Sequence, residues 1–212
     1  VENYAASVTA LATGRAHIAW LGAVTTAQAR MQMGDGITIL GCRDIDKGFV
    51  SYFIANPSTG LETVTDLAEL ARAADGQPWT FTFGSKSSTS GHMMPRKYFM
   101  DQTGTTPEKV FRTVAYSGSH DVVMQMVADG THHVGALNYA SWDKAPEDLK
   151  PKAPIVYKTP PYTNYALTAR AEFDGGDSSR GIRITPLDAG DGEFVLRDDG
   201  IGNGRGQFLG LC

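Results

Sequence analysis

The sequence predicts an α/β fold built around a mostly parallel sheet. Short apolar segments that are typical of strands alternate with longer segments at helical spacing, and turns that contain glycine separate them. Apolar residues make up 42% of the 212 residues and charged residues 20%, a composition that suits a globular domain. A chain of this length can bury a sizeable core, either in one large domain or in two smaller lobes.

The first half of the chain begins with a helix and then alternates between strands and helices. Tyr4, Val8 and Leu11 fall on one face at helical spacing, which predicts the first helix. A later helix within 64–74 can be capped by Thr65 or Asp66, because both side chains accept hydrogen bonds from free N–H groups. The segments expected between these helices are a strand within 14–22, a helix over 23–33, and strands over 37–42 and 48–55.

The second half continues this alternation and then loses it. From Phe173 onward, ten of the last forty residues are Gly, mixed with many Asp and with little apolar periodicity. This composition predicts a poorly ordered or atypical tail over 173–212. The segments expected before the tail are strands over 79–84, 111–116, 132–138, 154–158 and 163–170, and helices that begin near Ser88 or Thr89 and over 119–130.

Composition and cysteine usage argue against several functional classes. The net charge of −4, without a Lys/Arg block, gives no basic surface for nucleic acid. No apolar run approaches the roughly eighteen residues that a membrane-spanning helix needs. Cys42 and Cys212 provide neither a disulfide framework nor metal-ligand spacing, so no cofactor or metal is predicted. Cys42 itself is expected to be a small buried residue or a ligand for a soft element.

Two strand-to-helix turns, 83–91 and 115–121, predict a site for an anion. Open α/β sheets bind ligands beyond the carboxyl ends of their strands, where the free N–H groups of helix N-termini point. Ser88, Thr89 and Ser90 add hydroxyl donors without a formal charge. His120 lies in the first turn of the next helix, where the helix dipole should lower its pKa and favour a neutral imidazole that donates one N–H.

Simpler interpretations of the same residues stay open. Ser and Thr cap helices in any protein, so the serine-rich turn can be structural. A Walker A loop is excluded because Gly91 is followed by His92 rather than by Lys and Ser or Thr. A hydrolase that uses Ser88 with His120 is a further alternative, although no Gly-x-Ser-x-Gly elbow is present. The adjacent histidines at 132–133 are expected to be packed or solvated.

Four separated motifs give the chain a resemblance to a known family. "LATGRAHIAWLGAVT", "FTFGSKSSTSGHMMPRKYF", "VAYSGSHDVVMQMVADG" and "TPPYTNYALTAR" resemble the PhnD-like periplasmic solute-binding proteins, which serve ABC importers of phosphonates, phosphite and related oxyanions. The resemblance runs from about Asn3 to Arg170. It implies the type II periplasmic binding protein fold, in which two α/β lobes joined by crossing strands hold the ligand in a cleft.

The resemblance also implies how the lobes divide the chain. Residues 1–80 are expected to form part of lobe 1, residues 81–159 lobe 2, and residues 160–172 a return strand to lobe 1. The family's first β-α-β unit and its signal peptide are expected to lie ahead of Val1. Closure is expected about strands near Phe81–Gly84 and Pro160–Tyr165.

The family's site residues transfer onto matching positions of this sequence. Its Ser-Thr-Ser-Gly turn falls on Ser88, Thr89, Ser90 and Gly91, and its Ser-Gly-Ser-His turn places Ser119 and His120 at the ligand. Trp20 and Gly22 match the family's tryptophan and glycine, with Leu21 where relatives often have Tyr.

Two further positions bear on the choice of ligand. Members that bind aminoalkyl phosphonates present acidic side chains to the ligand's ammonium, and the aligned residues here are Tyr139 and Asn164. Burying a cation without a carboxylate is costly, so a compact oxyanion such as phosphite or a small phosphonate is expected, with selenate-like anions also open.

The expected function is therefore the periplasmic, or lipid-anchored extracytoplasmic, binding component of an ABC importer. Its partners would be a small oxyanion and the importer's permease and ATPase subunits, and no enzyme activity is expected. One alternative is a periplasmic sensor, for example of arsenite through Cys42, that partners a membrane histidine kinase. Another is a bare α/β domain in which the hydroxyl-rich turns only cap helices.

Overall fold

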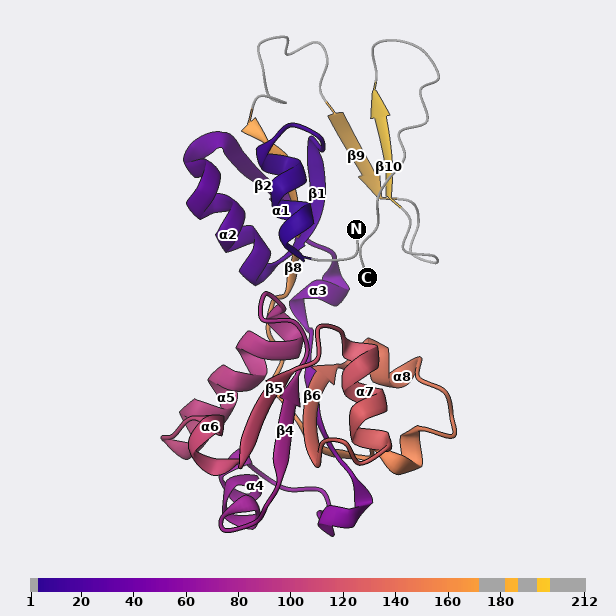
Figure 1. The fold of residues 1–212 in the computed structure, drawn as a ribbon. Helices are drawn as coiled ribbons and strands as arrows, with labels where there is room; N and C mark the ends of the chain where they lie inside the picture. The colour runs from indigo at the N-terminus through magenta and orange to yellow at the C-terminus, as the bar shows by residue number, and fades with distance from the viewer. Residues whose placement is uncertain (1–3, 172–181, 187–193, 199–212) are drawn as a thin grey trace.

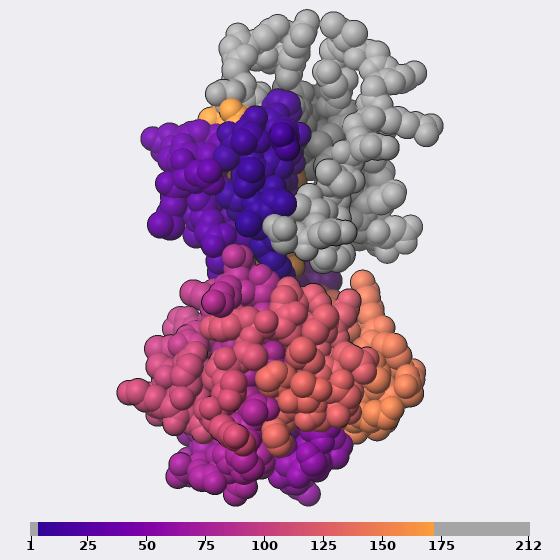
Figure 2. Space-filling model, in the orientation of Figure 1, coloured from indigo at the N-terminus to yellow at the C-terminus, as the bar shows by residue number. Residues whose placement is uncertain are grey.

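The computed structural model describes residues 4–171, 182–186 and 194–198, which include two lobes joined by a constriction (Figure 1, Figure 2). One lobe contains a three-stranded sheet and the other a five-stranded sheet. The chain passes from the first lobe to the second through residues 42–50 and returns through residues 159–164. The predicted two-lobed α/β architecture is therefore confirmed.

The smaller lobe is an antiparallel sheet with two helices on one face. Strand β8 (Tyr165–Arg170) lies between β1 (Ile18–Gly22) and β2 (Ile37–Gly41) and is antiparallel to both. Helices α1 (Tyr4–Ala12) and α2 (Ala23–Met33) pack on this sheet, and η1 (Gly34–Gly36) connects α2 to β2. Their shared core consists of Val8, Leu11, Leu21, Ala29 and Ile37.

The larger lobe is a five-stranded sheet in the order β5-β4-β6-β3-β7. Neighbouring residues of its central strands point to opposite faces, so Phe53 and Ile54 enter two different apolar cores. The strands are β3 (Ser51–Ala55), β4 (Thr80–Phe83), β5 (Thr113–Tyr116), β6 (Val134–Asn138) and β7 (Ile155–Lys158).

Helices cover both faces of this sheet (Figure 1). The face that carries Phe53 packs against α4 (Leu67–Ala74), α5 (Met94–Thr103) and α6 (Pro107–Val110). The opposite face packs against α7 (His120–Ala128) and α8 (Tyr139–Asp143). The short 3-10 segments of this lobe are η2 (Pro57–Thr59) and η4 (Lys150–Lys152).

The strand directions differ from the predicted, mostly parallel sheet. β4 is parallel to β5 and β6, but β3 is antiparallel to β6 and β7, and within the described residues the parallel pairs are confined to β4. The reason is that the chain enters this lobe through β3, which therefore runs away from the other lobe. β4 and β6 run back toward it, so their carboxyl ends meet at the waist.

The sheet pairing also differs from the expected lobe boundary at residue 80. Because β3 pairs with β6 and β7, and α4 packs in the same core as β4, residues 51–80 belong to the larger lobe. Phe81 is buried in that core, so the segment Phe81–Gly84 is not a crossing strand. The first crossing segment is instead 42–50, which carries α3 (Asp44–Lys47), and the chain crosses back through residues 159–164.

The helix starts agree with the capping chemistry. Asp66 caps α4 through a 2.7 Å bond from the Glu69 N–H, so of the two candidates Asp66 fills this role and Thr65 does not. Ser88 precedes a π-helical turn, η3 (Thr89–Met93), that leads into α5. In the predicted tail, β9 (Ile182–Pro186) and β10 (Phe194–Asp198) form an antiparallel pair, and the rest lies outside the described residues. No helix within the described ranges has both the length and the apolar character to cross a membrane.

Candidate anion-binding site

The serine-rich turn lies at the carboxyl end of β4 and is buried. Ser88, Thr89 and Ser90 are only 1%, 4% and 1% exposed. The Ser88 hydroxyl accepts a 2.9 Å hydrogen bond from the Gly91 N–H and so caps the helical turn, as its sequence context predicts. The Gly84 N–H donates to the Gly91 carbonyl at 2.9 Å, which closes the turn onto the end of the strand. These hydroxyl groups therefore face the protein interior at the waist.

The second predicted turn lies directly beside the first. The Ser117 N–H and hydroxyl both donate to the Phe83 carbonyl at 2.9 Å, and the Gly118 N–H donates to the Gly84 carbonyl at 3.3 Å. These bonds continue the parallel pairing of β4 and β5 past the end of the strands. The two strand-to-helix turns thus form one continuous edge.

His120 is held by a backbone donor as a neutral imidazole. Its Nδ1 atom accepts a 3.1 Å hydrogen bond from the Asn138 N–H, so the proton of the neutral ring lies on Nε2. Burial lowers the pKa of His120 to about 4. The direction is as predicted, but the cause is burial and not the dipole of α7. The Nε2 atom is buried without a hydrogen-bond partner in the described part of the chain. A buried, unpaired N–H donor is costly unless a ligand accepts from it.

Gly91 brings the first turn into contact with His120. A Cβ atom at this position would lie 2.7 Å from His120 Cε1 and 3.0 Å from the Ser88 hydroxyl oxygen. Any larger side chain would therefore separate the imidazole from the turn. At Gly91 the histidine ring thus occupies the space that a side chain would fill.

The smaller lobe contributes the N-terminus of α2. Its N-cap residue is Gly22, which offers no side chain to the free N–H groups of the helix. The Thr89 hydroxyl oxygen accepts a 2.9 Å bond from the Val24 N–H, so a side chain of the larger lobe caps a helix of the smaller lobe. A Cβ atom on Gly22 would lie 3.1 Å from the Thr89 hydroxyl and 3.5 Å from Asn164 Oδ1. These contacts bring both lobes and the return segment together.

Tyr4 makes a contact that the sequence analysis missed. Its hydroxyl donates to the Ser88 hydroxyl oxygen at 3.2 Å, across the waist. Because Ser88 then accepts two hydrogen bonds, its own proton is left to be donated. Tyr4 is the first residue of α1 and lay on the predicted apolar face of that helix, and nothing in its local sequence distinguishes it from a core residue.

Asn164 is the predicted site residue on the return segment, and its side chain is almost completely buried. It is 2% exposed, and neither its Nδ2 nor its Oδ1 atom has a hydrogen-bond partner among the described residues. Its backbone N–H donates to the Asp46 carbonyl at 2.9 Å. A buried amide with unused donors close to Gly22 and Thr89 is suited to a polar ligand.

Several predicted residues lie outside this cluster. The Leu21 side chain is 1% exposed and packs in the core of the smaller lobe, so it does not face the waist. Ser119 is exposed and caps α7 through a 3.3 Å bond from the Val122 N–H. Tyr139 is half-buried, with its ring 4.9 Å from that of Phe49. Trp20 is half-buried beneath a guanidinium group, 4.6 Å from the ring centroid.

That guanidinium group belongs to an ion pair between half-buried Arg43 and buried Asp46, which the sequence analysis also missed. Arg43 bonds Asp46 through Nε at 2.8 Å and Nη2 at 2.9 Å, and its backbone N–H adds a third bond at 3.1 Å. Asp46 is fully buried in the first crossing segment. Its carboxylate is thus committed to Arg43 and is not free to pair with a cationic group of a ligand.

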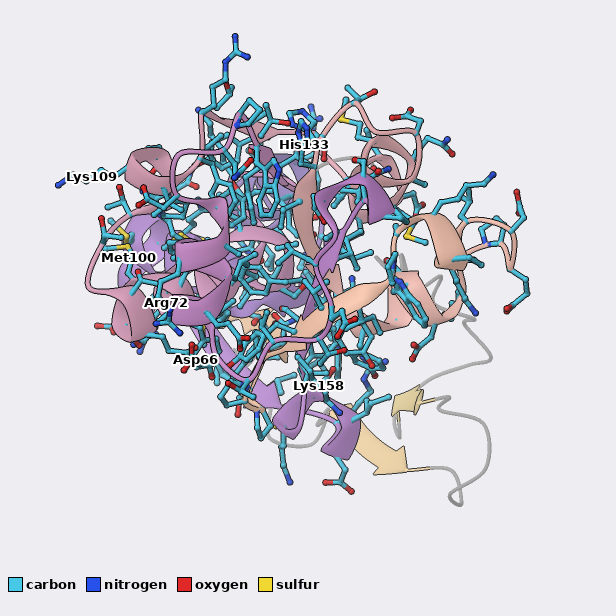
Figure 3. The ribbon with its side chains drawn as sticks, turned by 90° about the horizontal axis from the view of Figure 1, so that it is seen from below. Asp66, Arg72, Met100, Lys109, His133 and Lys158 are labelled. Atoms are coloured by element: carbon cyan, nitrogen blue, oxygen red, sulfur yellow. The ribbon has the colours of Figure 1, made fainter. Side chains whose placement is uncertain are left out.

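The remaining candidates lie apart from the site. Cys42 is exposed and not buried as one alternative expected, and the part of the chain that the structure describes contains no group of three potential metal ligands. The Nδ1 atom of His133 lies 3.1 Å from the Thr80 hydroxyl, so the ring is packed. Figure 3 shows His133 apart from Arg72 and Lys109, which lie on another side of the larger lobe.

Two surface hollows lie outside this cluster of polar groups. One, of about 380 Å³, lies against α1, and another, of about 310 Å³, lies between α4 and the segment that ends in α6. At the waist, by contrast, hydroxyl and N–H groups of the two lobes contact one another directly. The two lobes are therefore in direct contact at the waist.

The cluster has the chemistry of an anion site made from neutral donors. Hydroxyl groups, a neutral imidazole N–H, an amide and helix N-termini converge from both lobes and the return segment. A hydrolase that uses His120 as a base is disfavoured, because Nδ1 is occupied by the Asn138 N–H and the low pKa makes the ring a weak base. Two α/β lobes that meet at such donors define a solute-binding protein.

Sequence comparison identifies the family within this class. Residues 1–183 match the model of the periplasmic substrate-binding proteins of phosphonate ABC transporters, and the chain belongs to this family. It is 33% identical over 178 residues to a probable ABC transporter phosphite-binding protein, PhnD1, of Prochlorococcus marinus strain MIT 9301. That alignment covers 82% of this chain and 58% of the relative, so the chain spans little more than half the length of this curated relative.

Solved structures give the same fold. The structure of Prochlorococcus marinus PhnD1 in complex with methylphosphonate matches with a TM-score of 0.73 and 32% identity, over 82% of this chain and 64% of that one. A binding protein component of an ABC phosphonate transporter from Pseudomonas aeruginosa matches with a TM-score of 0.64 over 80% of this chain and 56% of that one. At 22% identity, the second match supports the type II fold alone.

Proposed function

We propose that this chain is the periplasmic solute-binding component of an ABC importer and that it binds a small phosphorus oxyanion, phosphite or a small phosphonate, between its lobes. The observation that carries the proposal is the convergence of Ser88, Thr89 and the buried, unpartnered Nε2–H of His120 at the waist. One matched relative, PhnD1 of Prochlorococcus marinus, is named as a probable phosphite-binding protein and its structure contains methylphosphonate, which supports the same class of ligand.

The binding mechanism follows from the donors. An anion at the waist would accept hydrogen bonds from the Ser88 hydroxyl and His120 Nε2–H of the larger lobe and from the N-terminus of α2 in the smaller lobe. Because every one of these groups is neutral, the site holds charge through oriented dipoles and not through a counter-ion. The lobes close about segments 42–50 and 159–164, and the Thr89 to Val24 bond stabilises the closed form.

The substituent on phosphorus should be small and uncharged. Asn164 is uncharged and stands where an acidic side chain would be needed for an ammonium group, and the nearby carboxylate of Asp46 is paired with Arg43. An aminoalkyl group would therefore be buried without a counter-charge, which is unfavourable. Hydrogen, as in phosphite, or a methyl group avoids this cost.

Membership of the family supports a permease and an ATPase as the proposed partners. A substrate-binding protein of an ABC transporter delivers its ligand to a permease driven by an ATPase, and it works in the periplasm. A sensor role has only fold-level support, because the match to the periplasmic VFT2 domain of Bordetella pertussis BvgS has 17% identity and a TM-score of 0.50.

A calorimetric and thermal-shift panel tests the proposal. Phosphite and methylphosphonate should bind and raise the melting temperature, since a ligand at a hundredfold excess over Kd adds about 2.7 kcal/mol of stability. Phosphate, sulfate and 2-aminoethylphosphonate should bind more weakly or not at all. Equal responses to sulfate and to phosphite would contradict a phosphorus-specific site, and no response to any anion would remove the proposed function.

A further inference from the structure

A hydrogen-bond chain of three buried side-chain and backbone groups links the return segment to the anion-binding turn. The Tyr162 hydroxyl lies 2.5 Å from the Ser51 hydroxyl, and the Ser51 hydroxyl donates to the Ser90 carbonyl at 2.7 Å. Ser51 has one proton, which it gives to Ser90, so Tyr162 must be the donor in the first bond. The direction of the chain is therefore fixed from Tyr162 through Ser51 to Ser90.

The phenol of Tyr162 is well suited to remain a donor. Burial raises the pKa of its hydroxyl above the usual value, and hydrogen bonding by Ser51 and Ser90 only partly opposes this rise. The hydroxyl therefore stays protonated throughout the physiological pH range. Consecutive hydrogen bonds of this kind in a buried site polarise and strengthen one another.

Tyr162 is itself held in place by the two crossing segments. Its N–H donates to the Phe49 carbonyl at 2.9 Å, and the Phe49 N–H donates to the Tyr162 carbonyl at 3.0 Å. Ser51 lies two residues after Phe49, and its N–H donates to the Thr159 hydroxyl at 2.9 Å. Tyr162 therefore belongs to the return segment, and Ser51 directly follows the first crossing segment as the first residue of β3.

The hydrogen-bond chain ends at the peptide unit between Ser90 and Gly91, whose two polar groups both form hydrogen bonds in the turn. The peptide bond between Ser90 and Gly91 is planar, so its carbonyl and its N–H point in opposite directions. Ser51 fixes the carbonyl end, and the N–H end donates to the Ser88 hydroxyl. The orientation of the Ser88 hydroxyl, one of the proposed anion donors, thus depends on the hydroxyl of Tyr162 through Ser51.

We infer that Tyr162 is a positioning residue, which aligns the Ser88–Gly91 turn for the anion through Ser51. Because Tyr162 is bonded to Phe49 of the other crossing segment, ligand affinity then depends on the contact between the two crossing segments. This inference rests on the proposed function, in which that turn binds the ligand. Tyr162 itself need not touch the ligand.

The test compares Tyr162→Phe with Tyr157→Phe in the 212-residue chain. Tyr157 is a matched control, because it is 8% exposed against 9% for Tyr162 and its hydroxyl bonds Gln102 Nε2 at 2.8 Å in the core of the larger lobe. Tyr162→Phe should raise the Kd for methylphosphonate by roughly tenfold, and Tyr157→Phe should leave it unchanged. Both variants should lose similar thermal stability, so a general loss of stability cannot account for the difference.

A second readout does not depend on ligand. Hydrogen exchange of the Gly91 amide should be faster in Tyr162→Phe and unchanged in Tyr157→Phe, because only the first variant removes the hydrogen bond that orients the Ser51 hydroxyl toward the Ser90 carbonyl. Ser51→Ala should change the affinity and the Gly91 exchange in the same direction as Tyr162→Phe. The double variant should show no larger effect than the stronger single variant, since all of these substitutions interrupt the same series of hydrogen bonds. Ser51→Ala also serves if Tyr162→Phe does not fold.

The outcomes separate the two proposals. Unchanged affinity and unchanged Gly91 exchange in both Tyr162→Phe and Ser51→Ala would overturn the positioning role. If the unmodified chain binds none of the phosphorus oxyanions, the proposed function fails, and the Gly91 exchange comparison still decides whether Tyr162 aligns the turn. Additive effects of the two substitutions on affinity would also count against a single chain.

Discussion

The hydroxyl oxygen of Thr89 lies 2.9 Å from the backbone nitrogen of Val24, so one lobe supplies the N-terminal cap of a helix in the other. In most proteins a helix is capped by the residue that precedes it. Here that residue is Gly22, and the Val24 N–H of α2 obtains its side-chain acceptor from the other lobe. This bond therefore stabilises the observed contact between the lobes.

Thr89→Val should weaken ligand binding. The substitution keeps the shape of the side chain but removes the acceptor for the Val24 N–H and a hydroxyl of the site. The expected loss is about 1 to 3 kcal/mol, which corresponds to roughly a fivefold to 150-fold rise in the Kd for methylphosphonate measured by calorimetry. Thr89→Ser, which keeps the hydroxyl, should retain most of the affinity. Equal affinities in both variants would show that the hydroxyl has no part in binding.

Gly91→Ala should disrupt the site by displacing His120. The added methyl group would lie 2.7 Å from the Cε1 atom of that ring, so the imidazole or the turn must shift. Overpacking of this kind costs about 1 to 3 kcal/mol, and binding should fall correspondingly. Gly41→Ala is the matched control, because its Cβ meets nothing within 4 Å and its φ is not in the positive range that disfavours alanine. Binding by Gly91→Ala at the wild-type level would refute the close approach.

The buried His120 predicts how stability depends on pH. Its pKa is lowered from 6.5 to about 4 in the folded chain, so between these values the unfolded state binds more protons and stability falls as the pH falls. The full effect is roughly 3 kcal/mol, complete near pH 4. Urea unfolding of the chain and of His120→Gln between pH 7 and pH 4 isolates this contribution, because other histidines titrate in both. Parallel curves for the two proteins would contradict a buried neutral imidazole.

Asn164→Asp should change which phosphonate is preferred. A carboxylate at this buried position would repel an oxyanion and could pair with an ammonium group. Affinity for methylphosphonate at pH 7 should fall by more than about tenfold, and that for 2-aminoethylphosphonate should fall less or rise. Asn56→Asp adds the same charge at the far end of β3 and should leave both affinities unchanged. A uniform loss for both ligands would show that Asn164 does not face the substituent.

The parts of the fold that depend on neighbouring residues could be predicted from the sequence. Ser88 as a helix cap and the strand that ends at Phe83 follow from contacts within a few residues. The direction of β3 could not be predicted, because alternation of strands and helices does not say which distant strands pair. For the same reason residues 51–80 were expected in the wrong lobe.

The site divides in the same way. The hydroxyls of Ser88 and Thr89 and the ring of His120 could be found because each lies in a turn with a recognisable sequence. Tyr4 and the Arg43–Asp46 ion pair could not, since their positions become meaningful only when segments far apart in the chain meet. Leu21 shows the converse error, because a backbone position at the waist does not fix where its side chain points.

The reciprocal backbone bonds between Phe49 and Tyr162 have a mechanical consequence. Two independent connectors would let the lobes swing and twist about different axes. Two connectors bonded to each other bend as a single ribbon, which leaves essentially one direction of rotation. Each opening and closing cycle would then return the donors of both lobes to the same mutual alignment. The conformational entropy lost on bringing the two lobes together would therefore be small.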